Sequence, residues 1–240
     1  MKIISIASLK GGVGKTSLAL FLGQAMAYKG KRVLSVDLDH NNNLTDFYLR
    51  DTDPDVLESH NVYHALTGSK PVSTCIFPSE FNIDMLPATP TVAKIGLELA
   101  RDPGALLRFP SALRRLDYEV VIIDTPPALS FELTAALYAA DLILCPVAWS
   151  RWTVQGFNLL AEECAHVSEG TGRPLVVHVV PSIVIDSEVE KLEKLDSWTM
   201  TAGKISKSTA IKNAGSAGSA LRAASKSWEE FNALADEVLR

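Results

Sequence analysis

Residues 10–16 read Lys10-Gly11-Gly12-Val13-Gly14-Lys15-Thr16 and closely follow the apolar run Ile3-Ile4-Ser5-Ile6-Ala7. An apolar strand that leads into a glycine-rich loop, with a helix beginning at the Lys-Thr end, is typical of a phosphate-binding loop. The backbone N–H groups of such a loop form a nest for anions, and the following helix adds its positive N-terminal end. Glycines are needed because a Cβ would block the close approach of phosphate.

The residues of this loop also predict a nucleotide and a metal. Lys15 supplies a point charge to the β- and γ-phosphates, and the Thr16 hydroxyl is placed to bind Mg²⁺. The common loop pattern has Gly five residues before Gly14, whereas this chain has Leu9 there and Lys10 after it. The loop is therefore a deviant form, KGGxGK[ST], with a second lysine at its entrance.

With that second lysine, the chain resembles the ParA/MinD family of deviant Walker A P-loop ATPases, and most of all its ParA/Soj-type DNA-partition members. The resemblance implies ATP and Mg²⁺ as ligands. It also implies a homodimer with ATP sandwiched between the subunits, in which Lys10 reaches the phosphates of the partner. The ATP-binding residues that it implies are Lys10, Gly11, Gly12, Val13, Gly14, Lys15, Thr16, Ser17, Pro181 and Ser182.

The composition fits one large α/β domain. The chain has 240 residues, of which 47% are hydrophobic and 21% charged, enough for a substantial core. No apolar run reaches the roughly 18 residues of a membrane-spanning helix. Three cysteines without a CxxC motif indicate reduced core thiols in a cytosolic protein. The net charge of −5 means that a nucleic-acid surface would have to be a local patch.

Strand-like and helical segments alternate along the chain. Runs rich in Val, Ile and Leu predict strands at residues 2–8, 32–37, 82–87, 119–124, 142–147 and 175–180. Most are continuously apolar, which indicates strands buried on both faces of a parallel sheet. Helices are expected at residues 17–29, 62–68, 91–100, 105–116, 131–140, 154–168, 187–195 and 228–239. This alternation predicts an α/β fold with a doubly wound, mostly parallel sheet and helices on both faces.

Two carboxylates end the second predicted strand, Val33-Leu34-Ser35-Val36-Asp37-Leu38-Asp39. Carboxylates at a sheet edge cost desolvation free energy unless a cation or water compensates them. In the family that the chain resembles, the first lies near the P-loop lysine and the metal, and the second positions the attacking water. Those roles carry over to Asp37 and Asp39. The family usually continues Asp-Pro-Gln-Gly-Asn, but here His40-Asn41-Asn42-Asn43 follows, so a turn-capping role for Asp39 is the alternative.

The fourth predicted strand ends in Val120-Val121-Ile122-Ile123-Asp124, followed by Thr125-Pro126-Pro127. An acid at the tip of an apolar strand, combined with a P-loop, places a carboxylate where Mg²⁺ and its waters would bind. The run matches the family's Walker B pattern. The metal site is therefore predicted at Thr16, Asp37 and Asp124, and the catalytic residues that the resemblance implies are Lys10, Lys15, Asp39 and Asp124.

Charge is segregated in the last third of the chain. Residues 201–227 contain five basic side chains and no acid, whereas residues 186–196 contain five acids and two lysines, which indicates a basic face. The equivalent region of ParA proteins binds DNA without reading its sequence, so we expect DNA contacts at Lys204, Lys207, Lys212, Arg222 and Lys226. A solvated loop with ordinary lysines is the alternative. The last helix is acidic, which disfavours a membrane anchor of the MinD type.

These observations predict a single P-loop ATPase domain over residues 1–240, cytoplasmic and nucleoid-associated. No N-terminal helix-turn-helix domain is expected, since the loop begins at residue 10. The function that the resemblance implies is an ATP-dependent, dimerising ATPase that binds DNA non-specifically and partitions a plasmid or chromosome. Its activity would be weak without a centromere-binding partner protein. A MinD-like membrane-positioning ATPase and a small-molecule P-loop ligase are the alternatives.

Overall fold

One sheet organises the part of the chain that the computed structural model describes, residues 1–102, 104–194 and 198–240. Within it, eight strands lie in the order β3-β4-β2-β5-β1-β6-β7-β8, and the named strands pair in parallel except for the β3–β4 hairpin. Their bounds are β1 Lys2–Ile6, β2 Val33–Asp37, β3 Phe77–Pro78, β4 Ile83–Leu86, β5 Val120–Asp124, β6 Leu142–Val147, β7 Val176–Val184 and β8 Ile205–Ser206. The predicted doubly wound, mostly parallel α/β fold is confirmed.

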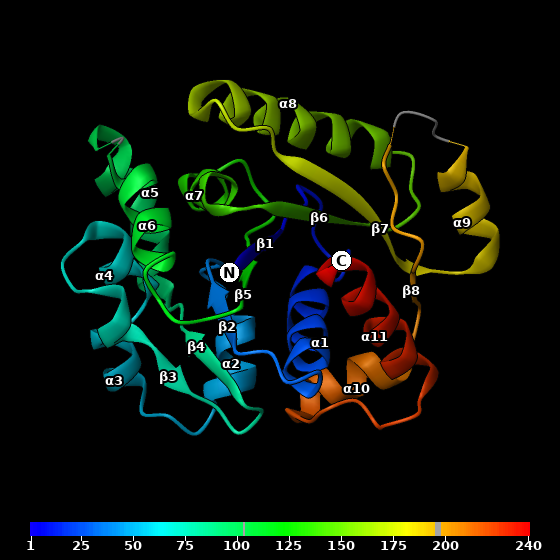
Figure 1. Ribbon diagram of the computed structural model, residues 1–240, viewed down its shortest axis with the longest axis horizontal. Coiled ribbons are helices and arrows are strands. Elements are labelled where there is room, and N and C mark those ends of the chain that lie inside the picture. Colours follow the sequence, from blue (N-terminus) through cyan, green and yellow to red (C-terminus); the bar gives the residue numbers. More distant parts are fainter. Residues whose placement is uncertain (103, 195–197) are drawn as a thin grey trace.

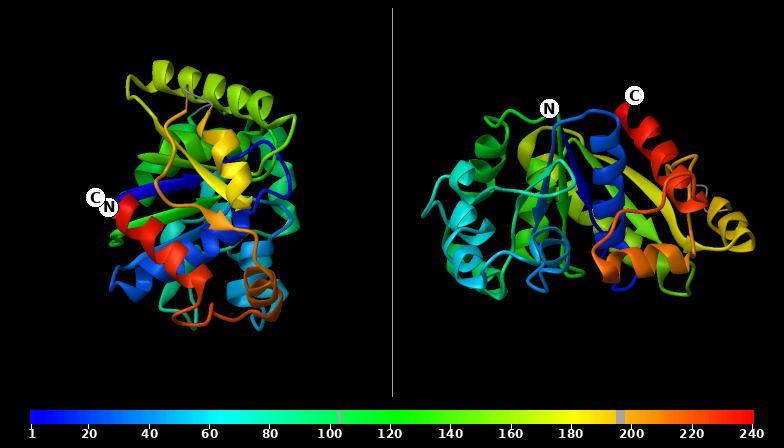
Figure 2. Two further views of the ribbon diagram at one scale, coloured as in Figure 1. Left: turned by 90° about the vertical axis from the view of Figure 1, so that its right-hand side faces the viewer. Right: turned by 90° about the horizontal axis from the view of Figure 1, so that it is seen from below.

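Helices cover both faces of this sheet (Figures 1 and 2). Their bounds are α1 Lys15–Tyr28, α2 Asn43–Leu49, α3 Pro54–Ser59, α4 Val62–Thr67, α5 Ile95–Glu98, α6 Ala105–Leu113, α7 Phe131–Ala139, α8 Thr153–Thr171, α9 Asp186–Glu193, α10 Thr209–Ala217 and α11 Lys226–Leu239. Helices α1, α2 and α11 pack on one face, and α4 to α8 pack on the other. Short 3₁₀ turns lie at Val72–Cys75, Pro90–Lys94 and Leu99–Arg101.

Because the strands are continuously apolar, both faces of the sheet must be covered by helices. Neighbouring residues of a strand point to opposite faces, so Ile3 packs with α4 to α7 while Ile4 packs with α1 and α11. All five residues of β5 are buried. A strand of this kind is stable only where both of its faces are covered. Cys75, Cys145 and Cys164 are free and buried in this core, as the sequence predicted.

The acidic last helix packs on the domain. Phe231 of α11 is fully buried, and its ring centroid lies 5.4 Å from that of Phe21 in α1. Lys29 at the end of α1 forms an ion pair of 2.8 Å with Asp236 of α11. Helix α11 is therefore held to α1 by both an apolar contact and an ion pair. In the described part of the chain, no helix has both the length and the apolar character that crossing a membrane requires.

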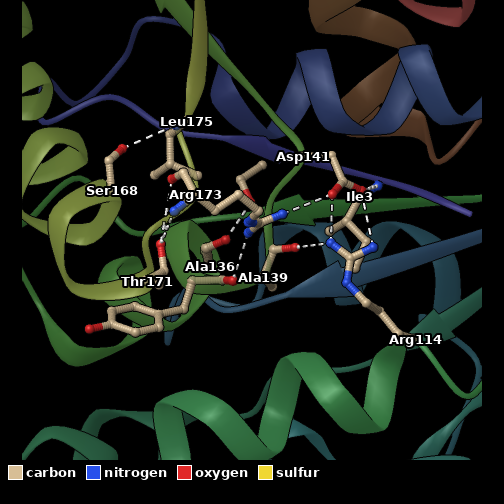
Figure 3. A network of polar contacts seen from close by, with 11 residues as sticks. Ile3, Arg114, Ala136, Ala139, Asp141, Ser168, Thr171, Arg173 and Leu175 are labelled. Carbon is tan, nitrogen blue, oxygen red and sulfur yellow. Dashed lines mark hydrogen bonds and ion pairs between the residues drawn. The ribbon is translucent and has the colours of Figure 1, made fainter.

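A polar network lies at the end of the sheet where the parallel strands begin (Figure 3). Asp141, just before β6, accepts a hydrogen bond from the Ile3 N–H (2.8 Å) and ion pairs from Arg114 (2.6 Å) and Arg173 (2.9 Å). The same arginines donate to the carbonyls of Ala139 and Tyr138 at the end of α7. Partial burial raises the pKa of Asp141, but these donors outweigh it and hold that pKa below its usual range.

The structure corrects several predicted boundaries. Strand β7 continues past residue 180 because Pro181 still pairs with Val147 of β6, and Ser182 and Val184 pair with β8. The segment expected as one helix at 91–100 is instead divided into a 3₁₀ turn at Pro90–Lys94, the short helix α5 and a second 3₁₀ turn at Leu99–Arg101. Helices α2, α3 and α10 are short and were not predicted. The predicted helix end at residue 195 lies outside the described residues.

Candidate functional site

The glycine-rich loop follows β1 at the carboxyl edge of the sheet and leads into α1. Gly12 and Gly14 have positive φ angles of 73° and 87°, which residues with a Cβ adopt only at a cost. Helix α1 begins at Lys15 with no side-chain cap and no acid in its first turn. The free N–H groups and the positive helix end are therefore available to an anion.

The loop glycines differ in their surroundings. A Cβ at Gly11 or Gly12 would meet nothing within 4 Å, whereas at Gly14 it would lie 3.1 Å from Ser182 Oγ and 3.3 Å from Ile183 Cδ1. Gly14 therefore permits β7 to approach the loop. Ile183 itself has a φ of 58°, an uncommon angle for a β-branched residue, and no pattern in the sequence indicates it.

Parallel register brings the strand-end carboxylates together. Asp37 of β2 pairs with Asp124 of β5, which is also level with Ile6 at the end of β1. Lys15 is buried beside them, and its Nζ donates to the Lys10 carbonyl at 3.4 Å. Burial lowers the pKa of Lys15, while the charges of Asp124 and Asp39 oppose that shift. Residues predicted from three separate stretches thus meet at one sheet edge.

Asp37 holds the loop between β2 and α2. Its fully buried carboxylate accepts the Asp39 N–H on Oδ1 (3.0 Å), and the Thr45 N–H (3.0 Å) and hydroxyl (2.9 Å) on Oδ2. Burial raises the pKa of Asp37, and these hydrogen bonds offset part of the increase. Both oxygens therefore organise the protein, and direct metal binding by Asp37 stays a prediction. Thr45 was missed because nothing local in the sequence connects it to Asp37.

Asp124 differs from Asp37 in having no such support. It is 1% exposed, and neither of its oxygens has a hydrogen-bond partner among the described residues. Burial and the Asp37 charge raise the pKa of Asp124, and the nearby Thr16 hydroxyl and Lys15 ammonium offset this only in part. A buried carboxylate without a partner costs free energy, and a cation bound beside Asp124 would offset that cost.

The side chains around Asp124 suit Mg²⁺. Carboxylate and hydroxyl oxygens from Asp124 and Thr16 are the hard ligands that this ion prefers. Among the described residues, His, Cys, Asp and Glu do not form a cluster of three or more that could enclose a metal. That agrees with Mg²⁺, which usually takes one or two carboxylates and completes its shell with water and substrate phosphates.

Asp39 lies where the chain departs from the family pattern. It is 7% exposed, and its Oδ1 accepts the Asn41 N–H (3.0 Å) and the Asn41 side-chain amide (2.9 Å). Asn42 has a φ of 47° and directly precedes α2. The asparagines thus close a turn after β2, and Asp39 caps that turn. All hydrogen bonds that it accepts within the described residues go to Oδ1, which leaves Oδ2 for another donor.

A cavity of about 570 Å³ adjoins the loop. Gly12, Gly14 and Ser17 form one side, and Ser182 of β7 and Phe231 of α11 form others. Ser182 was predicted to contact ATP and does line this cavity, whereas Pro181 is buried within β7. Leu18 and Ile183 also line the cavity. Most of the other lining residues lie in β8, in α10 and between them, and they were not predicted to line a nucleotide cavity. They include Ile205, Ser206, Lys207, Ser208, Thr209, Ile211 and Lys212.

The basic stretch is folded rather than a loop, and its cations are not equivalent. Lys207, Lys212 and Arg222 are exposed and take part in none of the ion pairs of the described residues. Lys204 is paired with Asp186, and Lys226 lies 3.9 Å from Glu230. The acidic and basic stretches are therefore not fully segregated in space, because β7 and β8 are paired and bring Asp186 beside Lys204.

Comparisons of sequence agree with this geometry. A family model described as an AAA domain matches residues 1–176. The chromosome-partitioning ATPase Soj of Thermus thermophilus is 39% identical over 167 residues, which are 70% of this chain and 63% of that protein. The sporulation initiation inhibitor protein Soj of Bacillus subtilis is 33% identical over 189 residues, 78% of this chain and 74% of that protein. The chain thus spans less than two thirds of the length of the Thermus relative.

Comparisons of structure agree with the fold. Cobyrinic acid a,c-diamide synthase from Mycobacterium smegmatis, with a bound ATP analogue and magnesium, has a TM-score of 0.85 and 25% identity over 100% of this chain and 95% of that one. A plasmid partition protein from Borrelia burgdorferi bound to AMPPNP has a TM-score of 0.83 and 21% identity, covering 99% of this chain and 98% of that one.

Proposed function

Because the chain belongs to the ParA/Soj family of partition ATPases, we propose that it hydrolyses ATP with Mg²⁺ and uses this cycle to bind and release DNA. The observation that carries the proposal is Asp124. Its buried carboxylate, without a hydrogen-bond partner among the described residues, lies beside Lys15 and the uncapped start of α1. That combination supports a site for a phosphate chain and a divalent cation.

Each residue of the site has a distinct part in this proposal. The loop N–H groups and Lys15 hold the phosphates, and Thr16 and Asp124 hold the metal. Bound Mg²⁺ supplies charge neutralisation at the transferring phosphoryl group. Asp37 acts indirectly, by fixing the β2–α2 loop. Asp39 orients the attacking water through Oδ2, the carboxylate oxygen to which Asn41 does not donate.

The cavity beside the loop is proposed to receive the base and ribose. Its walls combine apolar side chains of Leu18, Ile205 and Phe231 with the hydroxyls of Ser182 and Ser206. An apolar slot with a few polar groups is the usual form of such a pocket. The test is binding of a fluorescent ADP analogue to the Ser206→Trp variant, in which the indole would fill the slot and abolish binding. Unaltered binding would contradict the assignment.

Lys10 is proposed to act across a dimer with ATP sandwiched between two copies. It is half-buried at the entrance of the loop, and a cation supplied to the partner's phosphates would act as an arginine finger does, an effect of roughly 10³–10⁵ in rate. We expect Lys10→Ala to retain ATP binding and to lose the hydrolysis that a centromere-binding partner and DNA stimulate. Undiminished stimulated turnover in this variant would contradict the role in trans.

Lys207, Lys212 and Arg222 are the cations proposed to contact DNA phosphates. Their replacement by Glu should abolish DNA co-sedimentation, which in the unaltered protein requires ATP and is lost with ADP. Because Lys207 and Lys212 also line the cavity beside the loop, ATP binding is measured on the same variant and should be retained. If each residue makes one phosphate contact, replacing all three by Ala should weaken binding and lower the slope of log K against log salt by about 2.7. The matched control is Glu at three exposed cations, Lys94, Arg101 and Arg115, which belong to segments beside α5 and α6 that pack on the other face of the sheet from α10. Absence of DNA binding by the unaltered protein with ATP would refute the function.

A small-molecule ligase is the second candidate, since one structural neighbour is a cobyrinic acid a,c-diamide synthase with 25% identity. The relatives at 33–39% identity favour partition instead. ATP turnover that needs an added small carboxylic acid and ignores DNA would support the ligase. A MinD-like protein would float with anionic liposomes in the presence of ATP, and the acidic α11, packed on α1, disfavours that outcome.

A further inference from the structure

We propose that Arg50 is a positioning residue that fastens α10 to α2 and thereby couples the nucleotide-site carboxylates to the basic surface formed by Lys207, Lys212 and Arg222. The inference rests on the proposed function, since it concerns how that surface is regulated. It depends on contacts between residues about 170 positions apart, for which Arg50 and Ala217 are the clearest case.

The first half of the coupling is the attachment of α2 to the carboxylates. Thr45, in the first turn of α2, gives both its N–H and its hydroxyl to Asp37 Oδ2 and also accepts the Ala88 N–H at 2.8 Å. Phe47, Tyr48 and Leu49 are buried. Helix α2 is therefore held firmly, and a displacement of the Asp37 loop would move the helix as a body.

The second half is the contact between the end of α2 and the end of α10, at the lower side of Figure 1. Arg50 follows α2 directly, and its Nη1 donates to the carbonyl of Ala217, the last residue of α10, at 3.2 Å. Its guanidinium lies so close over Gly218 that a Cβ there would overlap it. Gly218, with a φ of 63°, therefore provides the room for Arg50. A cation at the end of a helix also complements the helix dipole.

Helix α10 has few contacts along its length, so the contacts at its ends matter. Within α10, Ala214 is buried and Ile211 is partly buried against the core. At its start, Ser208 caps the helix and accepts a hydrogen bond from Ser227 at 3.0 Å. Ser208, Thr209 and Lys212 line the cavity beside the glycine-rich loop. The helix that carries Lys212 is thus held between the proposed nucleotide site at one end and Arg50 at the other.

Variants at both partners of the contact test the proposal. Arg50→Ala removes the guanidinium, and Gly218→Ala displaces it without changing the charge. Arg50→Lys keeps the charge and should restore part of the effect. Arg115→Ala is the matched control, since Arg115 is exposed and follows α6, which packs on the other face of the sheet from α10. The measurements are DNA affinity with Mg²⁺–ATP and with Mg²⁺–ADP, and hydrogen exchange of the α10 amides.

We expect Arg50→Ala and Gly218→Ala to reduce the ratio of DNA affinities between ATP and ADP at least tenfold, with ATP affinity within about twofold of the unaltered protein. Exchange of residues 214–217 should increase in both. If Arg50 were instead a direct phosphate contact, Arg50→Ala would weaken DNA binding equally with both nucleotides, lower the salt slope by about 0.9, and leave Gly218→Ala unaffected. That result would overturn the proposal.

The exchange measurement separates this proposal from the proposed function. If the unaltered protein binds no DNA with ATP, the function fails, but increased α10 exchange in Arg50→Ala still supports the fastening of α10. If DNA binding requires ATP and α10 exchange is the same in Arg50→Ala as in the unaltered protein, the function stands and the coupling through Arg50 is refuted.

Discussion

The three glycines of the phosphate loop should differ sharply in how they tolerate alanine. Gly11 has no positive φ and open space at its Cβ position, so Gly11→Ala should change the free energy of unfolding by less than about 1 kcal/mol. Gly12 has open space but a φ of 73°, and Gly12→Ala should cost about 1 kcal/mol. Gly14 combines a φ of 87° with neighbours at 3.1 and 3.3 Å, so Gly14→Ala should cost about 2–3 kcal/mol.

Urea unfolding of the nucleotide-free protein, followed by the fluorescence of its four tryptophans, measures this series. A loss of 2–3 kcal/mol corresponds to a decrease of about 4–12 °C in the melting temperature of a chain of this size. Gly11→Ala is the matched control, since it makes the same chemical change in the same loop. Equal losses at Gly11 and Gly14, or no loss at Gly14, would refute the link between backbone angle, crowding by β7 and stability.

Three further perturbations test the Asp141 network, the packing of α11 and the metal site. Asp141→Asn should lower the free energy of unfolding by about 1–2 kcal/mol at pH 7, because hydrogen bonds from the charged arginines to the carboxylate are lost. The folded-state pKa of Asp141 is lowered, so its stabilising effect is present above the unfolded-state pKa and is lost as the pH falls through the folded-state pKa. Urea unfolding from pH 7 to 3 should therefore show the free energies of unfolding of the two proteins converging. A difference that stays constant with pH would contradict this. Phe231→Ala should lower the free energy of unfolding by about 3–5 kcal/mol because it leaves a cavity. Glu229→Ala, at an exposed position of the same helix, should change it by less than about 0.5 kcal/mol. Similar losses in both variants would count against α11 as a core helix. Since burial raises the pKa of Asp124, Mg²⁺ binding should release a proton, and the affinity for Mg²⁺–ADP should increase with pH. Calorimetry in buffers of different ionisation enthalpy measures that release, which Asp124→Asn should abolish, and its absence in the unaltered protein would argue against Asp124 as a metal ligand.

Much of the central sheet, and the place of the candidate site at its carboxyl end, could be predicted from short stretches of sequence. Val, Ile and Leu runs such as 120–124 are apolar on both faces, and only a helix-covered parallel sheet buries them fully. The glycines, Lys15 and Thr16 lie within seven consecutive residues, so their geometry is local. For the same reason the strand-end acids Asp37 and Asp124 could be recognised from the short runs that precede them.

The contacts between these parts depend on the folded chain and could not be predicted from sequence. Whether a carboxylate has a partner depends on residues distant in sequence, and that distinguishes Asp124 from Asp37, which Thr45 supports. The same dependence explains why α10 was missed, since it buries a single residue and is held through its ends. It also separates the paired Lys204 from Lys207 and Lys212, because the pairing of β7 with β8 brings Asp186 to Lys204. Composition records which charges a chain carries, but strand register decides which of them meet.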